Sequence, residues 1–160
     1  MEKIIDNLEN YNIINFLIPG VIFVNILSFL IEKELHNDNI GIALVEYYFS
    51  GLVLSRIGSI IIKPALSKIK VVKFDNYEKY IKKEDKDEKL KLLQKEANQY
   101  RTYISVFTVL SFVEIYNCVF INYLKWKYII LFVAISVLFV MSYKKQINFI
   151  IERLNIKVKK

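Results

Sequence analysis

The sequence predicts an all-α polytopic membrane protein: a bundle of four transmembrane helices with a cytoplasmic helical segment between spans two and three. Long apolar runs lie at about 12–31, 40–62, 103–124 and 127–143. A helix of about 20 apolar residues crosses a hydrocarbon core, and lipid favours helices because every backbone hydrogen bond must close internally. Gly and Pro number only 4 and 2, and the polar residues fall in blocks, which excludes all-β and α/β folds. Residues 1–160 therefore form one membrane domain.

The first run follows a short amphipathic stretch at 1–10 and carries Pro19-Gly20 early in its length. Proline removes one helical hydrogen bond and frees the carbonyl of Asn15, so a kink or local break is expected there. The amides of Asn15 and Asn25 are suited to hydrogen bonds across helix contacts. A kinked, packed helix is favoured over a ligand site.

The second run contains a ridge of small side chains, Gly51, Ser55 and Ser59, spaced four residues apart and widened by Gly58. Such a ridge lets two helices approach closely in lipid, so it predicts a helix contact. We expect this contact to lie between copies of the chain, as a homo-oligomer formed through spans two and three.

The segment 64–101 is the only sizeable part outside the apolar runs, and it predicts a helical hairpin or shelf. Asp75 is placed as an N-cap, with Glu78 in the capping-box position. A later helix is expected to continue into the third span, with Leu90, Leu93, Ala97 and Tyr100 on one face.

The third run is the most polar, because small polar or charged residues recur every three positions: Ser105, Thr108, Ser111, Glu114 and Asn117. Such a stripe faces other helices or a wet cavity. The fourth run is almost purely aliphatic and is expected to face lipid. The basic tail at 144–160 either prolongs the fourth helix or lies along the headgroups.

Three charged residues lie within the runs, away from their ends: Glu46, Arg56 and Glu114. Each costs roughly 2.5–3.5 kcal/mol or more at mid-bilayer if it is unpaired. Counted along their helices, Arg56 and Glu114 differ in depth by about 8 Å, within reach of two extended side chains. They predict either an ion pair joining spans two and three or the polar lining of a pore.

The distribution of Lys and Arg predicts the orientation. The segment 63–101 has eleven Lys and one Arg, and the tail 144–160 has five Lys and one Arg. The loop 32–39 has one Lys against three acids. Because Lys and Arg accumulate on the cytoplasmic side, both termini are expected in the cytoplasm, in a bacterial inner membrane.

Several function classes lack their residues. The sequence has no phosphate-binding Gly-rich loop, no His-Glu-x-x-His and no Ser-His-Asp set, so we expect no enzyme and no cofactor. One Cys, Cys118, and one His, His36, leave no metal site. The net charge of +7 is assigned to membrane lipids rather than to nucleic acid, because the basic residues flank the spans.

Three stretches resemble small bacterial four-span proteins of anti-phage defence islands: Tyr11–Phe23 (YNIINFLIPGVIF), Leu54–Ile60 (LSRIGSI) followed by Pro64, and Asn98–Thr102 (NQYRT). In such systems a membrane protein either permeabilises the host membrane or anchors a soluble effector. The membrane subunit of the Kiwa system is one candidate of the second kind. The resemblance implies no catalytic residues.

The resemblance leads to a homo-oligomeric inner-membrane component of a defence system, which permeabilises the membrane or couples a membrane event to a soluble cytoplasmic effector. Two alternatives stay open. One is a passive anchor in which 64–101 and the tail recruit a soluble protein. The other is a small ion channel or transporter, although the chain has no visible inverted repeat.

Overall fold

The computed structural model describes residues 13–35, 37–73, 77–84, 87–120 and 126–155. The amphipathic stretch predicted at 1–10 and the N-cap predicted at Asp75 lie outside these residues. Within them every regular element is helical, which confirms the all-α part of the predicted fold class. The elements are a π-helical turn η1 (Ile13–Leu17), α2 (Ile18–Ile31), α3 (Ile40–Ile57), a second π-helical turn η2 (Gly58–Ile62), α4 (Lys63–Lys68), α5 (Tyr77–Glu84), α6 (Glu88–Phe120) and α7 (Trp126–Asn155).

Three helical stretches in the described residues are long and apolar enough to cross a membrane. They are Ile40–Lys68, Glu88–Phe120 and Trp126–Asn155, with 29, 33 and 30 residues. The first predicted span is a shorter apolar helix, Asn15–Ile31. The third span and residues 88–101 form one continuous helix, and the fourth helix continues past Lys144 to Asn155.

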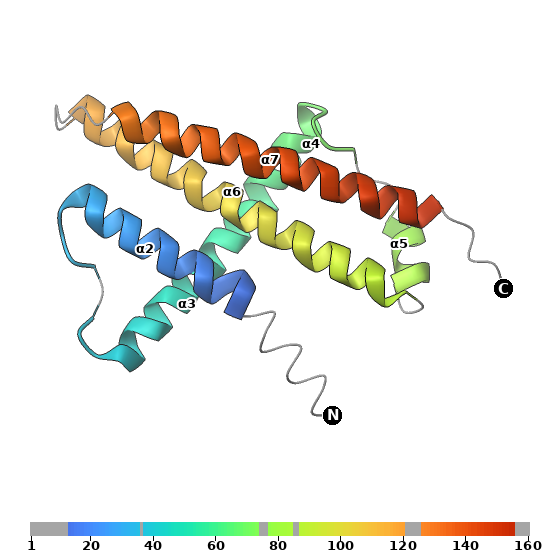
Figure 1. Ribbon diagram of the computed structural model, residues 1–160, viewed down its shortest axis with the longest axis horizontal. Coiled ribbons are helices and arrows are strands. Elements are labelled where there is room, and N and C mark those ends of the chain that lie inside the picture. Colours follow the sequence, from blue (N-terminus) through green and yellow to red (C-terminus); the bar gives the residue numbers. More distant parts are fainter. Residues whose placement is uncertain (1–12, 36, 74–76, 85–86, 121–125, 156–160) are drawn as a thin grey trace.

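The two longest helices, α6 and α7, pack antiparallel along each other (Figure 1). The hairpin of α2 and α3 packs on α6, and α3 crosses α6 on its way to α4. One end of the molecule holds the α2–α3 connection, the end of α6 and the start of α7. The other end holds α5, the start of α6 and the end of α7.

Each of the two prolines follows a π-helical turn. Pro19 stands at the start of α2 after η1, and Pro64 stands at the start of α4 after η2. A proline has no N–H and its ring collides with the carbonyl four residues earlier, so the turn before it widens. The irregularity expected at Pro19 is present in this form, and the second helical stretch continues past Pro64 to Lys68.

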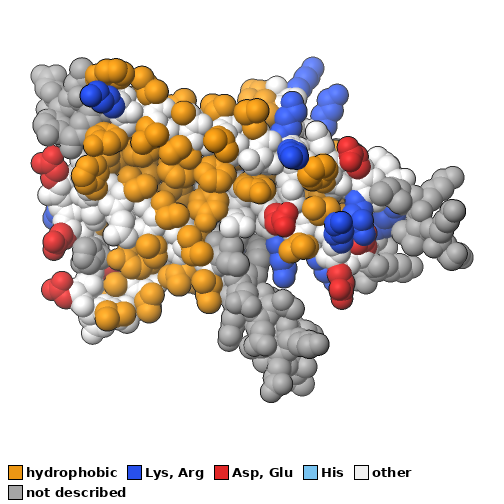
Figure 2. Space-filling model, viewed as in Figure 1, with side chains coloured by type: hydrophobic (Ala, Val, Ile, Leu, Met, Phe, Trp, Pro, Cys, Tyr) orange, Lys and Arg blue, Asp and Glu red, His pale blue; other side chains and the backbone are white. Residues whose placement is uncertain are grey.

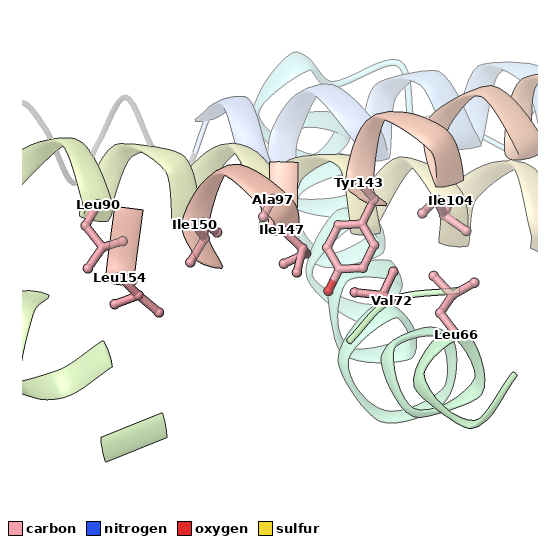
Figure 3. Close-up of a cluster of buried hydrophobic side chains, with 9 residues drawn as sticks. All are labelled: Leu66, Val72, Leu90, Ala97, Ile104, Tyr143, Ile147, Ile150 and Leu154. Atoms are coloured by element: carbon pink, nitrogen blue, oxygen red, sulfur yellow. The ribbon is translucent and has the colours of Figure 1, made fainter. Parts of the chain in front are cut away.

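Buried side chains form two clusters along the α6–α7 pair. The first cluster, in the apolar part, joins four helices through Leu30, Leu54, Val106, Phe107, Leu110 and Phe132. The second cluster lies toward the α5 end and is drawn in Figure 3: Leu66, Val72, Leu90, Ala97, Ile104, Tyr143, Ile147, Ile150 and Leu154.

Candidate functional site

Helix α3 touches η1 and α2 through backbone contacts at two glycines. A Cβ atom on Gly51 would lie 1.8 Å from the carbonyl oxygen of Phe16, and one on Gly20 would lie 1.7 Å from that of Tyr47. No side chain fits at such distances, so only glycine permits the contact. Gly51 therefore takes part in a helix contact within one chain, whereas the sequence predicted a contact between copies.

The rest of the small-residue ridge faces α6 of the same chain. A Cβ atom on Gly58 would meet the Oγ of Ser105 at 2.9 Å. The Ser59 hydroxyl donates to the Ser55 carbonyl at 2.9 Å and accepts a hydrogen bond from Nη2 of Arg101 at 3.1 Å. The ridge thus contacts η1, α2 and α6 of the same chain, and self-assembly stays a prediction.

Arg101 is the central side chain of this junction, and its position in the sequence did not mark it as a site residue. It is 9 % exposed, and Gly58 packs so closely on it that a Cβ atom there would lie 3.2 Å from the Arg101 Cγ. Lys63 and the phenol of Tyr143 lie close enough to interact with it electrostatically. Among the described residues Arg101 has no ion pair with a carboxylate, and its Nε has no hydrogen-bond partner.

Arg56 and Glu114 are not brought together. Arg56 is exposed on α3, whereas Glu114 is only 1 % exposed on α6. No ion pair joins them in the part of the chain that the structure describes. Similar depth is not enough for a contact, because successive residues of a helix point about 100° apart. Ser55 faces the bundle interior, so Arg56, the next residue, points away from it. Instead, Glu114 shares the bundle interior with Asn15 of η1, which is 2 % exposed.

The other predicted polar residues of the runs are less buried. Glu46 is half-buried on α3, and its Oε2 has no hydrogen-bond partner among the described residues. Asn117 is half-buried near the end of α6.

The hydroxyls along α6 are satisfied within the helix. Those of Thr102, Ser105 and Ser111 donate to the carbonyls of Asn98, Arg101 and Phe107, at 3.0, 3.2 and 2.7 Å. A hydroxyl that bonds to its own backbone can face a packed interior without water. These three hydroxyls therefore do not require the wet cavity that a pore would supply.

Past the apolar part, the start of α6 and the end of α7 form a stalk, defined as residues 87–100 and 144–155. Nε and Nη2 of Arg153 donate to the two carboxylate oxygens of Asp87, at 2.7 and 3.0 Å. The hydrogen bond from Arg153 holds the pKa of Asp87 below its usual value. Gln146 donates to the Leu93 carbonyl at 3.2 Å, and Lys83 of α5 donates to the Leu154 carbonyl at 2.7 Å.

Comparisons with protein-family models, with curated proteins and with solved structures found no match to this chain.

Proposed function

We propose that this chain is a four-span protein of the bacterial inner membrane that holds a soluble partner protein at the cytoplasmic face. The length of the α6–α7 hairpin carries the proposal. Helix α6 has 33 residues, about 50 Å, whereas a hydrocarbon core is about 30 Å thick. About 20 Å of the hairpin therefore stands outside the core as the stalk.

The charges support this orientation. In Figure 2, hydrophobic side chains cover the part of the molecule away from the stalk, which is called the apolar band below, and Lys and Arg gather at the stalk end. Lys144, Lys145 and Arg153 belong to the stalk, whereas Glu32, Glu34 and Asp38 lie in the loop at the opposite end. Cytoplasmic loops carry the Lys and Arg excess, so the stalk is assigned to the cytoplasm.

The fourth span is η1 with α2. They are contiguous from Ile13 to Ile31, about 28 Å at 1.5 Å per residue, which nearly matches the hydrocarbon thickness. Their backbone contact with α3 through Gly20 and Gly51 is a form of packing that lipid-embedded helices use. With an even number of spans, Ile13 and Asn155, the first and last described residues, are both assigned to the stalk side.

The partner that fits the stalk has an acidic surface with some apolar side chains. Lys89, Lys91 and Lys95 lie along one stretch of α6, and the exposed Leu92 (54 %) and Ile81 (48 %) offer apolar contacts outside the apolar band. Charge complementarity would bring the partner to the stalk, and apolar anchors would hold it.

The role in anti-phage defence stays a prediction from the resemblance, and permeabilisation is the competing activity. The internally bonded hydroxyls of α6 favour a platform, meaning a chain that holds a soluble partner, over a pore.

Photo-crosslinking in cells distinguishes the platform from the pore. We expect a crosslinker at Leu92 to yield an adduct with one soluble protein, and a crosslinker at the apolar-band position Val137 to yield none with that protein. Reversing the charges of Lys89, Lys91 and Lys95 should abolish the Leu92 adduct while membrane insertion is kept. Loss of membrane potential on expression of the chain alone, with adducts only between copies, would contradict the platform and favour the pore.

A further inference from the structure

Arg101 is a buried cation whose charge is not balanced within the described residues. Its side chain is 9 % exposed and donates a hydrogen bond to the neutral hydroxyl of Ser59. Nε is buried without a hydrogen-bond partner, and no carboxylate of the described residues forms an ion pair with it. A buried guanidinium left in this state is costly, so the site is built to receive an anion.

The neighbours of Arg101 suit a phosphate group. Lys63 is a second cation within electrostatic reach, and the phenol of Tyr143 borders the same site. The Ser59 hydroxyl accepts from Arg101 and donates to the Ser55 carbonyl, so it orients the guanidinium and does not donate to a ligand. Arg and Lys together with a hydroxyl donor bind phosphate oxygens through charge-assisted hydrogen bonds. A structural ion-pair network would need a carboxylate paired with Arg101, and the described residues place none there.

A groove of about 350 Å³ runs along the adjoining helix faces. Helix α6 lines it with residues from Ile104 to Ile115, and α7 lines it with residues from Val133 to Val140. Ile62, Ala65 and Leu66 close it on the side of η2 and α4. The lining is mostly apolar, and it is about 17 Å long on α6, close to half of a 30 Å hydrocarbon core.

The groove and the cation share the same helix faces. Arg101 lies three residues before Ile104, and Tyr143 lies three residues after Val140, so each stands one turn beyond the groove. Figure 3 shows Tyr143 beside Ile104, with Leu66 and Val72 across from them. A cationic site at the end of a one-leaflet apolar groove is the shape of a phospholipid site.

We propose that Arg101 and Lys63 bind the phosphate of an anionic phospholipid whose acyl chain lies in the groove between α6, α7 and α4. The lipid would fix α4, α6 and α7 relative to one another, since its headgroup meets residues of all three. This site needs only the membrane, not the partner protein, so it stands or fails separately from the platform function.

The test uses the full-length chain released from nanodiscs of equal phosphatidylglycerol and phosphatidylcholine, with retained lipid read by native mass spectrometry. The wild type is expected to retain one phosphatidylglycerol with at least about tenfold preference. Arg101→Gln should remove that preference, and Arg153→Gln, which changes the stalk arginine, should keep it.

Val137→Trp keeps Arg101 but fills the groove, so it decides the matter if Arg101→Gln does not fold. It should lower lipid retention at least about tenfold while the helical content is unchanged. Equal retention of both lipids by the wild type, or full retention by Val137→Trp, would overturn the proposal. Stabilisation by millimolar inorganic phosphate equal to that by phosphatidylglycerol would assign the site to a free anion and overturn the lipid.

Discussion

The two halves of the α6–α7 hairpin are held together by different forces, although the same two helices run through both. In the apolar band, lipid is as apolar as the side chains, so burial contributes little and close fit must hold the helices. There Phe107 stacks on Phe139 at 5.9 Å between ring centroids, and α3 meets η1 backbone to backbone at Gly51.

In the proposed orientation water surrounds the stalk, so burial of apolar area stabilises its helices. Leu90 and Ala97 are 0 % exposed, and Ile150 and Leu154 are nearly so. The Asp87–Arg153 pair closes the end of the stalk. The two halves are therefore stabilised in different ways. A substitution that disturbs close backbone contact should act mainly in the apolar band, and one that removes buried apolar area should act mainly in the stalk.

The largest effect is expected for Gly51→Leu. Even a Cβ atom would lie 1.8 Å from the Phe16 carbonyl, so α2 must leave α3, at a cost above about 3 kcal/mol. Hydrogen exchange should show loss of protection in α2 and α3 with the stalk intact. Gly41→Ala is the control, because its Cβ would meet only Asn39 Oδ1 at 3.3 Å. Smaller oligomers with unchanged protection would instead restore the contact between copies.

Leu90→Ala is expected to act in the opposite half. Leu90 is fully buried in the stalk, so truncation should cost about 2–5 kcal/mol there and leave α2 and α3 protected. The matched control is Leu92→Ala, whose side chain is 54 % exposed and should cost little. If both leucines behaved alike in hydrogen exchange, the stalk would not be a water-surrounded pair of helices.

Asp87→Asn should give the smallest effect, and one that depends on pH. Hydrogen bonding to Arg153 lowers the pKa of Asp87 from 3.8, so its contribution is present above pH 3.8 and is lost as the pH falls through the lowered pKa. For a partly exposed pair about 0.2–1 kcal/mol is expected at pH 7. Thermal scans of wild type and variant should differ at pH 7 and converge well below pH 3.8; a constant difference would contradict this assignment.

Periodicity and apolar length were enough to predict the helices, their continuity through Arg101 and the irregularity at Pro19. They were not enough to say which way a residue faces. Arg56 and Ser55 are neighbours in sequence, yet one is exposed and the other buried. The partner of the Gly51 ridge was also out of reach, because a small-residue ridge fits any close helix.

Arg101 was missed because it was counted among the charged residues of the segment 64–101. A signal was present: it lies four residues before Ser105 and continues the polar stripe of α6 by one turn. A charge that extends a buried polar stripe belongs to the bundle, and this could have been inferred from spacing alone.

The orientation of the stalk tests the account most directly. Single cysteines at Asn37 and Lys91 in a Cys118→Ser background would be exposed, in intact cells, to a thiol reagent that does not cross the membrane. Both positions are exposed, so access depends on the side of the membrane. The proposed orientation predicts labelling at position 37 alone, with position 91 labelled only after the membrane is opened. Labelling of position 91 in intact cells would contradict it.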